Sequence, residues 1–274
     1  MDTSRVTIIS GGGDEILRTT FRGGGGERPR FGVALFHGLG DHTGTYGEVA
    51  QAMVAAGGYV VGTDWPGNGG SSGPRGHLAG VGTAVGIIAE TVAAVREDIP
   101  AGAPIILAAH STGAFLVVQY LTQGGGDGIH SVWLNGALVE PAAGQPWVKQ
   151  MVALGLGRVL PQVTLPTGIE RDLCRRLEDD PPGMHGRVSL GFGAALIRAR
   201  RGLFGRLGAI EPGIRLLMTH GGEDRVCLPE SARRLFEAMP MREKRFELLP
   251  GLYHETFRDV GKEALFAVLR PWFA

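Results

Sequence analysis

The stretch Ile-Ile-Leu-Ala-Ala-His-Ser-Thr-Gly, residues 105–113, decides the fold of this chain. Its apolar start suits a buried strand, and residues 114–118 continue it in a helical pattern. A serine on a tight turn from strand to helix has its hydroxyl held clear of the backbone, and small residues must flank it because strand and helix nearly touch. Ala109 and Gly113 are the small flanking residues around Ser111, which we interpret as a nucleophile.

The same turn also has a purely structural interpretation. Ser111 or Thr112 could simply cap the N-terminus of the helix, a role that hydroxyl side chains often take. The usual nucleophile motif has glycine at both small positions, so Ala109 makes this match incomplete. The interpretation as a nucleophile therefore depends on a base and an acid elsewhere in the chain.

Length and composition set broad limits on the class of protein. With 274 residues, the chain can form one large core with an inserted segment. Lysine plus arginine and aspartate plus glutamate both number 27, so no global charge attracts nucleic acid or an anionic membrane. The start lacks the pattern of a secretory signal, and no window of about 18 residues is uncharged and apolar. We therefore expect a cytoplasmic protein in which Cys174 and Cys227 are free thiols.

Strands and helices alternate along most of the chain. Strands are predicted at 31–36, at 59–63, at the apolar start of the stretch 105–113, and at 131–135, 215–219 and 245–249. Helices are predicted at 46–56, at 80–98, from the end of the stretch 105–113 to residue 122, at 229–238 and from 261 onward. This alternation predicts an α/β fold with a mostly parallel, doubly wound sheet. Residues 6–9 and 15–22 flank a glycine run and predict an N-terminal antiparallel hairpin at the sheet edge.

The alternation stops between residues 140 and 206, which we interpret as an inserted helical cap. A nearly all-apolar helix is predicted at 147–160, and such a helix buries both sides or contacts an apolar ligand. Its candidate substrate contacts are Trp147, Met151 and Leu154. The predicted domains are a first half of the core (1–139), the cap (140–206) and a second half of the core (207–274).

Two later strands supply the missing base and acid. A serine hydroxyl needs a base within hydrogen-bond reach, and the base needs an orienting carboxylate. Asp224 follows the strand at 215–219, and His254 follows the strand at 245–249. The C-terminal ends of parallel strands share one edge, so both residues can meet Ser111 there. The chain order serine, aspartate, histidine is the one that the α/β-hydrolase fold requires.

Other polar residues near these motifs have less specific interpretations. Asp64 and Glu223 are alternative acids, and only geometry separates Glu223 from Asp224. We expect His110 to pack beside the turn. Asp41, His42 and His77 are expected to be structural loop residues.

Six short blocks in a fixed order carry a joint signature across about residues 31–258. They are His37 to His42, the Asp64-x-x-Gly-x-Gly-x-Ser-x-Gly loop, His110 to Gly113, Arg171-Asp172 with Asp180-Pro181, Gly221 to Asp224, and Gly251 to Glu255. With them the chain resembles the monoacylglycerol lipase and lysophospholipase (serine aminopeptidase S33-like) branch of the α/β hydrolases. It departs from that pattern at Asn68, Ala109 and Thr112, and Thr112 adds a hydroxyl beside the reaction centre.

The resemblance implies a serine hydrolase that cleaves carboxylic esters through an acyl-enzyme, with Ser111, Asp224 and His254 as its catalytic residues. It implies that the backbone N–H groups of Leu39 and Thr112 form an oxyanion hole, where two fixed donors stabilise the tetrahedral alkoxide. The implied substrates are small acyl esters or lipids with medium or long chains, such as monoacylglycerols and lysolipids. No cofactor or metal ion is implied.

Two other functions remain open at this point. The same fold could bind a hydrophobic ligand without catalysis, because a fold does not dictate a function. Gly38, Gly40 and Gly44 follow a strand, with Asp64 after the next one, and this resembles the dinucleotide fingerprint of an oxidoreductase. However, none of the four tyrosines begins a Tyr-x-x-x-Lys motif, which is the commonest active-site motif of reductases that use such a loop.

A basic cluster in the cap also has two interpretations. Arg198, Arg200 and Arg201 could form an ordinary solvated face. Beside an apolar cap helix, they could instead make transient contact with a lipid surface. Nothing in the sequence indicates the oligomeric state.

Overall fold

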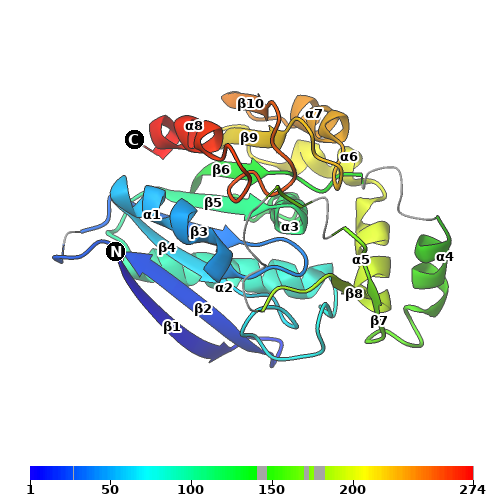
Figure 1. The fold of residues 1–274 in the computed structure, drawn as a ribbon. Coiled ribbons are helices and arrows are strands. Elements are labelled where there is room, and N and C mark those ends of the chain that lie inside the picture. Colours follow the sequence, from blue (N-terminus) through cyan, green and yellow to red (C-terminus); the bar gives the residue numbers. More distant parts are fainter. Residues whose placement is uncertain (27, 141–146, 170–172, 176–182, 274) are drawn as a thin grey trace.

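One sheet runs through the whole molecule (Figure 1). The computed structural model describes residues 1–26, 28–140, 147–169, 173–175 and 183–273. The order of the eight strands in the sheet is β1-β2-β4-β3-β5-β6-β9-β10. Their bounds are β1 (Asp2–Ile9), β2 (Glu15–Arg22), β3 (Phe31–Phe36), β4 (Gly58–Thr63), β5 (Ile105–His110), β6 (Ile129–Asn135), β9 (Arg215–Gly221) and β10 (Lys244–Leu249). The strands from β4 to β10 pair in parallel.

The strand at the edge differs from those at the centre. Strands β3, β4 and β5 are buried along their whole length, as expected for parallel strands covered on both faces. By contrast, β1 is almost entirely exposed and pairs only with β2, in antiparallel register, and β2 pairs antiparallel with β4. The predicted mostly parallel sheet and its N-terminal hairpin are therefore confirmed.

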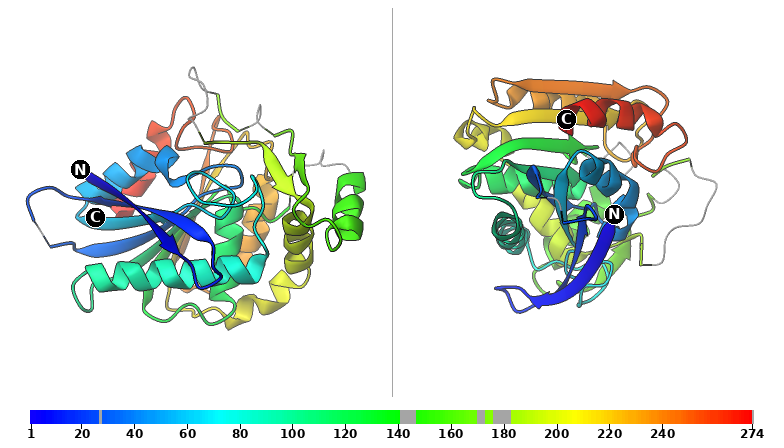
Figure 2. Two further views of the ribbon diagram at one scale, coloured as in Figure 1. Left: turned by 90° about the horizontal axis from the view of Figure 1, so that it is seen from below. Right: turned by 90° about the vertical axis from the view of Figure 1, so that its left-hand side faces the viewer.

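Helices cover both faces of the sheet, as Figure 2 shows. On one face lie α1 (Gly47–Ala55) and α8 (Glu263–Phe273), whose apolar residues share a buried cluster with Val33, Leu35 and Trp133. On the other face lie α2 (Val81–Asp98), α3 (Thr112–Leu121) and α7 (Pro229–Ala238), packed in the larger cluster. This arrangement is the predicted doubly wound architecture.

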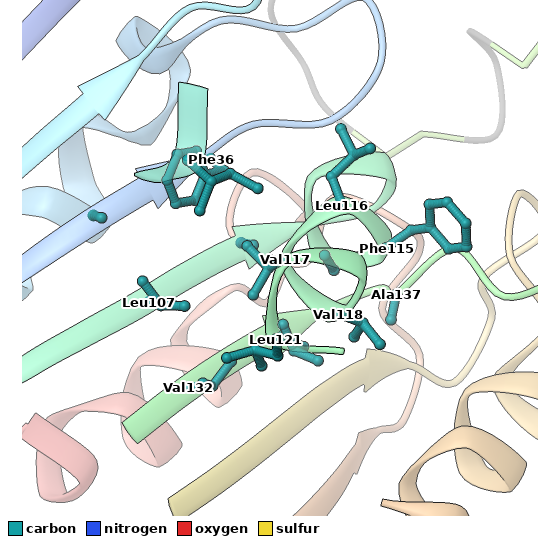
Figure 3. Close-up of a cluster of buried hydrophobic side chains, with 14 of the residues drawn as sticks. Phe36, Leu107, Phe115, Leu116, Val117, Val118, Leu121, Val132 and Ala137 are labelled. Atoms are coloured by element: carbon teal, nitrogen blue, oxygen red, sulfur yellow. The ribbon is translucent and has the colours of Figure 1, made fainter. Parts of the chain in front are cut away.

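Helix α3 is packed tightly against the middle of the sheet. Figure 3 shows Val117, Val118 and Leu121 over Leu107 of β5 and Val132 of β6, and all five side chains are buried. Burying each such aliphatic side chain contributes about 1.5–3 kcal/mol. The start of α3 is thereby fixed against the end of β5, so the turn between them has little freedom.

The segment between β6 and β9 forms a separate layer beside the C-terminal ends of the parallel strands (Figure 1). Its elements are α4 (Trp147–Leu156), β7 (Thr164–Pro166), β8 (Arg187–Ser189), α5 (Leu190–Arg200) and α6 (Leu203–Arg206). Helices α4 and α5 pack on each other, and β7 pairs antiparallel with β8. The helix predicted at 147–160 was wrong in its extent, because it ends at Leu156 and leaves Val159 and Leu160 exposed.

Candidate active site

The turn between β5 and α3 gives Ser111 an unusual backbone conformation. Ser111 has φ 53° and ψ −119°, and among the described residues no other non-glycine residue has positive φ. Such a conformation costs about 1–3 kcal/mol and persists only where the surroundings enforce it. Here the Ser111 N–H donates to the Asn135 carbonyl at 2.9 Å, and its own carbonyl accepts from the N–H groups of Phe115 and Leu138.

The residues around this turn explain the need for small side chains. A Cβ atom on Gly113 would lie 2.5 Å from the His37 carbonyl oxygen and 2.6 Å from that of Phe36, so this position requires glycine. Ala109, where the usual motif has glycine, is 1% exposed and packs in the larger core cluster. The close approach of α3 therefore constrains the position two residues after the serine, while the position two residues before it accommodates a methyl group.

A continuous hydrogen-bonded chain joins three side chains from distant parts of the sequence. The Ser111 hydroxyl lies 2.8 Å from His254 Nε2, and His254 Nδ1 lies 2.7 Å from Asp224 Oδ2. Asp224 Oδ1 accepts the N–H groups of Val226 and Cys227 at 2.8 and 2.9 Å. The three residues follow β5, β10 and β9, so their proximity depends on the shared C-terminal edge of the sheet.

The electrostatics of this chain favour a base at His254. Burial alone would lower the pKa of His254, but the charge and hydrogen bond of Asp224 outweigh it and raise that pKa above its ordinary value. Burial likewise opposes ionisation of Asp224, yet His254 and the hydrogen bond from His220 hold its pKa well below the usual range. Asp224 is therefore ionised at neutral pH and orients the imidazole.

His110 lies against His254 but remains neutral. Their ring centroids are 4.6 Å apart, and His110 Nδ1 lies 3.1 Å from the Asn135 carbonyl oxygen. Burial, followed by the neighbouring His254, lowers the pKa of His110 well below its ordinary value. A neutral His110 avoids repulsion of a protonated His254, and its position beside the turn is the packing role expected from the sequence.

The two alternative acids, Asp64 and Glu223, do not take the place of Asp224 beside His254. Asp64 is buried, and its oxygens accept the N–H groups of Thr43 and Gly70 at 2.8 and 2.9 Å, which ties two loops together. Glu223 is exposed, whereas its neighbour Asp224 is buried against His254. Geometry thus separates the two adjacent carboxylates.

Two loop histidines have structural contacts. His42 caps the short 3₁₀ helix η1 (Thr43–Tyr46) by accepting the Gly44 N–H at 3.1 Å. His77 Nδ1 lies 2.9 Å from Ser189 Oγ, which links the loop before α2 to the start of α5.

Leu39 and Thr112 both line the cavity that contains Ser111. Neither backbone N–H has an acceptor within the part of the chain that the structure describes. Thr112 is also the first residue of α3, where the free N–H groups and the helix dipole favour negative charge. The loop after β3 and the start of α3 therefore each contribute one free backbone donor to the residues that line this cavity.

A cavity of about 210 Å³ is lined by Ser111 and His254, two members of the hydrogen-bonded chain of side chains. Its walls are mainly apolar, with Phe115 and Val226 contributed by the core and Leu165, Leu196 and Ile197 by the segment between β6 and β9. The residues of α5 that line it recur every three or four positions from Leu190 to Arg200, so one face of the helix forms the wall. Such a cavity suits an apolar chain.

Polar groups gather in the same cavity near His254. Asp41 and Glu255 are both 2% exposed and line the cavity wall. Asp41 Oδ1 accepts the N–H of His42 and the hydroxyl of Thr45, each at 2.8 Å. Burial, followed by these two carboxylates, raises the pKa of Tyr46 well above its ordinary value, so Tyr46 stays neutral. From the sequence we expected only a structural role for Asp41, and its place in the cavity wall was not anticipated.

The three substrate contacts predicted between residues 147 and 154 differ in what the structure describes of them. The side chains of Trp147 and Met151 lie outside the described part of the structure. Leu154 is half-buried and packs in the small cluster between α4 and α5, and it is its neighbour Ala153 that lines the cavity. The blocks 171–172 and 180–181 also lie outside the described residues.

The two cysteines are free thiols, and only Cys227 lines the cavity. Cys227 is fully buried, and burial followed by the nearby Asp224 raises the pKa of its thiol well above the ordinary value. Cys227 is therefore a neutral thiol at physiological pH and a weak nucleophile.

The basic cluster in the segment between β6 and β9 is divided between solvent and the cavity. Arg200 lines the cavity, whereas Arg198 and Arg201 are exposed. The predicted contact with a lipid surface stays a prediction. Within the described residues, no helix has the length and apolar composition to cross a bilayer.

The loop after β3 does not have the form of a dinucleotide site. The Gly40 carbonyl accepts the His185 N–H at 2.8 Å, and a Cβ atom on Gly40 would collide with the His185 carbonyl oxygen. The chain around His185 therefore covers Gly40, one of the glycines that a pyrophosphate would need to approach. This loop instead contributes Gly38 and Leu39 to the cavity beside Ser111.

Comparisons with known proteins agree with this geometry. The family model described as serine aminopeptidase, S33, matches residues 27–261. A monoacylglycerol lipase of Mycolicibacterium smegmatis is 30% identical over 250 residues, which cover 89% of this chain and 88% of that protein.

Solved structures give the same result. The crystal structure of Paleococcus ferrophilus monoacylglycerol lipase superposes with a TM-score of 0.83 at 29% identity and covers 94% of this chain and 98% of that one. A soluble variant of monoglyceride lipase from Saccharomyces cerevisiae, in complex with a substrate analog, also has a TM-score of 0.83, at 18% identity and with 95% and 92% coverage, and at that identity shares the fold alone.

Proposed function

Because the chain belongs to the serine aminopeptidase S33 family of α/β hydrolases, as its six motif blocks predicted, we propose that it is a serine ester hydrolase of the monoacylglycerol lipase type. The observation that carries this proposal is the hydrogen-bonded chain from Ser111 through His254 to Asp224, which faces an apolar cavity. A serine activated in this way performs acyl transfer.

The proposed reaction has two halves. His254 Nε2 takes the proton from Ser111 as the serine oxygen bonds to the ester carbonyl carbon, and the same proton then passes to the alcohol as the ester bond breaks. The acyl group remains on Ser111. A water molecule next gives a proton to His254 and attacks the acyl-enzyme, and that proton returns to Ser111 as the carboxylic acid leaves.

Two backbone donors support the transition state in this proposal. The carbonyl oxygen becomes an alkoxide in both halves of the reaction, and the N–H groups of Leu39 and Thr112 are free to donate to it. The N-terminus of α3 adds a favourable dipole at Thr112. Because both donors belong to the main chain, substitution of the Leu39 side chain should have little effect on kcat.

The cavity favours a substrate with an apolar chain and a small polar alcohol. Leu165, Leu196 and Ile197 offer an apolar surface for an acyl chain. Asp41 and Glu255 line the same cavity as Ser111, and buried carboxylates accept strong hydrogen bonds from hydroxyl groups. Monoacylglycerols and related lysolipids of medium or long chain combine these two features.

A panel of esters tests this function. Wild-type protein and a Ser111→Ala variant are compared on p-nitrophenyl esters with two to sixteen carbons, a monoacylglycerol and a lysophospholipid, with released fatty acid as the readout. We expect wild type alone to hydrolyse them, with a preference for medium or long chains and for the monoacylglycerol. Equal binding of fatty acyl ligands by both proteins, with hydrolysis by neither, would instead support a non-catalytic binding protein.

A further inference from the structure

A second histidine is bonded to the carboxylate that orients His254. His220 lies in β9, four residues before Asp224, and is fully buried. Its Nε2 atom lies 3.0 Å from Asp224 Oδ2, the same oxygen that His254 Nδ1 contacts at 2.7 Å. The Asp224 oxygen is therefore held between two imidazole rings.

The partners of His220 define which ring nitrogen carries hydrogen. His220 Nε2 lies 3.1 Å from the Cys227 carbonyl oxygen as well as 3.0 Å from Asp224 Oδ2. Neither oxygen has a hydrogen to offer, because one is a carbonyl and the other belongs to an ionised carboxylate. The hydrogen must therefore be on Nε2, which donates toward both oxygens.

The four donors around Asp224 leave its carboxylate little freedom to rotate. Val226 and Cys227 donate backbone N–H groups to Oδ1, and His254 and His220 donate ring N–H groups to Oδ2. Without His220, Oδ2 would keep only its bond to His254, and the buried Cys227 carbonyl would lose its partner. A misoriented carboxylate would no longer hold His254 in line with Ser111.

We propose that His220 is a positioning residue that acts through Asp224, so that the catalytic chain of this protein has four members, Ser111, His254, Asp224 and His220. His220 touches neither the substrate nor Ser111. Its role is to fix the orientation of the carboxylate during both halves of the reaction. This inference rests on the proposed function of Ser111.

The alternative is that His220 only ties the end of β9 to the turn at Cys227. A structural role of that kind would appear as lost stability with unchanged turnover per folded molecule. A positioning role lowers kcat and leaves KM nearly unchanged, because His220 does not line the cavity. The two roles therefore differ in a measurable way.

The test compares His220→Leu with His220→Gln on p-nitrophenyl butyrate. Leucine removes the donor, whereas the glutamine amide nitrogen reaches about as far as Nε2 and can donate to Asp224 Oδ2. We expect His220→Leu to lower kcat about 10- to 100-fold with KM changed less than about 3-fold. His220→Gln should recover most of the lost kcat.

The control variant is Met218→Ala, a buried position of the same strand that packs in the larger core cluster. Thermal melts give the Tm of each variant, and kinetics are measured well below the lowest of them. Met218→Ala should lower the Tm without lowering kcat per folded molecule. If His220→Leu behaves like Met218→Ala, the inference is overturned.

The same experiment separates this inference from the proposed function. If Ser111→Ala is inactive while His220→Leu keeps full kcat, only the positioning role fails. If Ser111→Ala keeps activity, the proposed function fails whatever His220 does. Should His220→Leu not fold, equal kcat of His220→Gln and His220→Asn decides against the inference, because asparagine is too short to replace Nε2.

Discussion

The two sides of the cavity are built from different kinds of structure. On the side of the sheet, Ser111, Asp224 and His254 follow strands that belong to one continuous ladder. On the other side, the layer between β6 and β9 has a small core of its own, formed by Ala153, Leu190 and Ala194. The backbone of the sheet thus positions the reacting groups, while side chains of the added layer shape the space for the substrate. Substitutions on the two sides should therefore have different kinetic signatures.

The largest effect is expected at the serine. Ser111→Ala should lower kcat by roughly 10⁴- to 10⁶-fold, because no other nucleophile accepts the acyl group. The fold should persist, because the turn is enforced by its surroundings rather than by the hydroxyl. Ester hydrolysis and far-UV circular dichroism measure the two properties. Full activity in a folded Ser111→Ala variant would refute the assignment of the nucleophile.

The acid comes next. Asp224→Asn should lower kcat by about 10³- to 10⁴-fold, because the amide no longer holds His254 in the required tautomer. Glu223→Gln is the matched control, since Glu223 is the exposed neighbour of Asp224. We expect the control to change kcat by less than about 3-fold. A similar loss in both variants would show that geometry has not separated the two carboxylates.

A smaller effect is expected from pH. The pKa of His254 is raised above its ordinary value of about 6.5, so the imidazole gains a proton as pH falls through that pKa and can no longer act as a base. Below it, kcat/KM should fall about 10-fold per pH unit. Asp224 and His110 do not titrate in this range, because the pKa of each lies lower. A flat profile of kcat/KM between pH 5 and 8 contradicts the role of His254.

The smallest effect is expected on the other side of the cavity. Ile197→Phe should narrow the apolar wall and shift the preference toward shorter acyl chains, by about 10-fold in the ratio of kcat/KM for long and short esters. Val159→Phe serves as control, because Val159 is 76% exposed in the same layer. The control should leave the ratio unchanged. A loss of activity on all chain lengths with Ile197→Phe would mean that this layer also positions the reacting groups.

The sheet and the proximity of Ser111, His254 and Asp224 could be anticipated from the sequence. The predicted strands at the centre of the sheet were short apolar runs, and the sequence pattern alone placed Asp224 and His254 after two predicted strands. Parallel strands bring their ends to one edge, so chain order was enough to expect the proximity to Ser111. This part of the site depends mainly on the backbone.

Features that depend on side-chain packing were harder to anticipate. Strands β7 and β8 have three residues each, which is too short for an alternating pattern. The helix predicted to reach residue 160 ends at Leu156, just before Gly157, a signal for a helix end that the apolar pattern outweighed. The contact of His220 with Asp224 follows from how the chain turns after β9, for which the sequence holds no periodic signal. The position of Asp41 in the cavity wall had no such signal either.

The most direct test of the account is the site of acylation. The protein is mixed with a p-nitrophenyl ester, quenched with acid during the initial burst, and mapped by peptide mass spectrometry. We expect one acyl group per molecule, on the peptide and side chain of Ser111, and none in Ser111→Ala. An acyl group on another residue that lines the cavity, such as Cys227, or turnover with no covalent adduct, would contradict it.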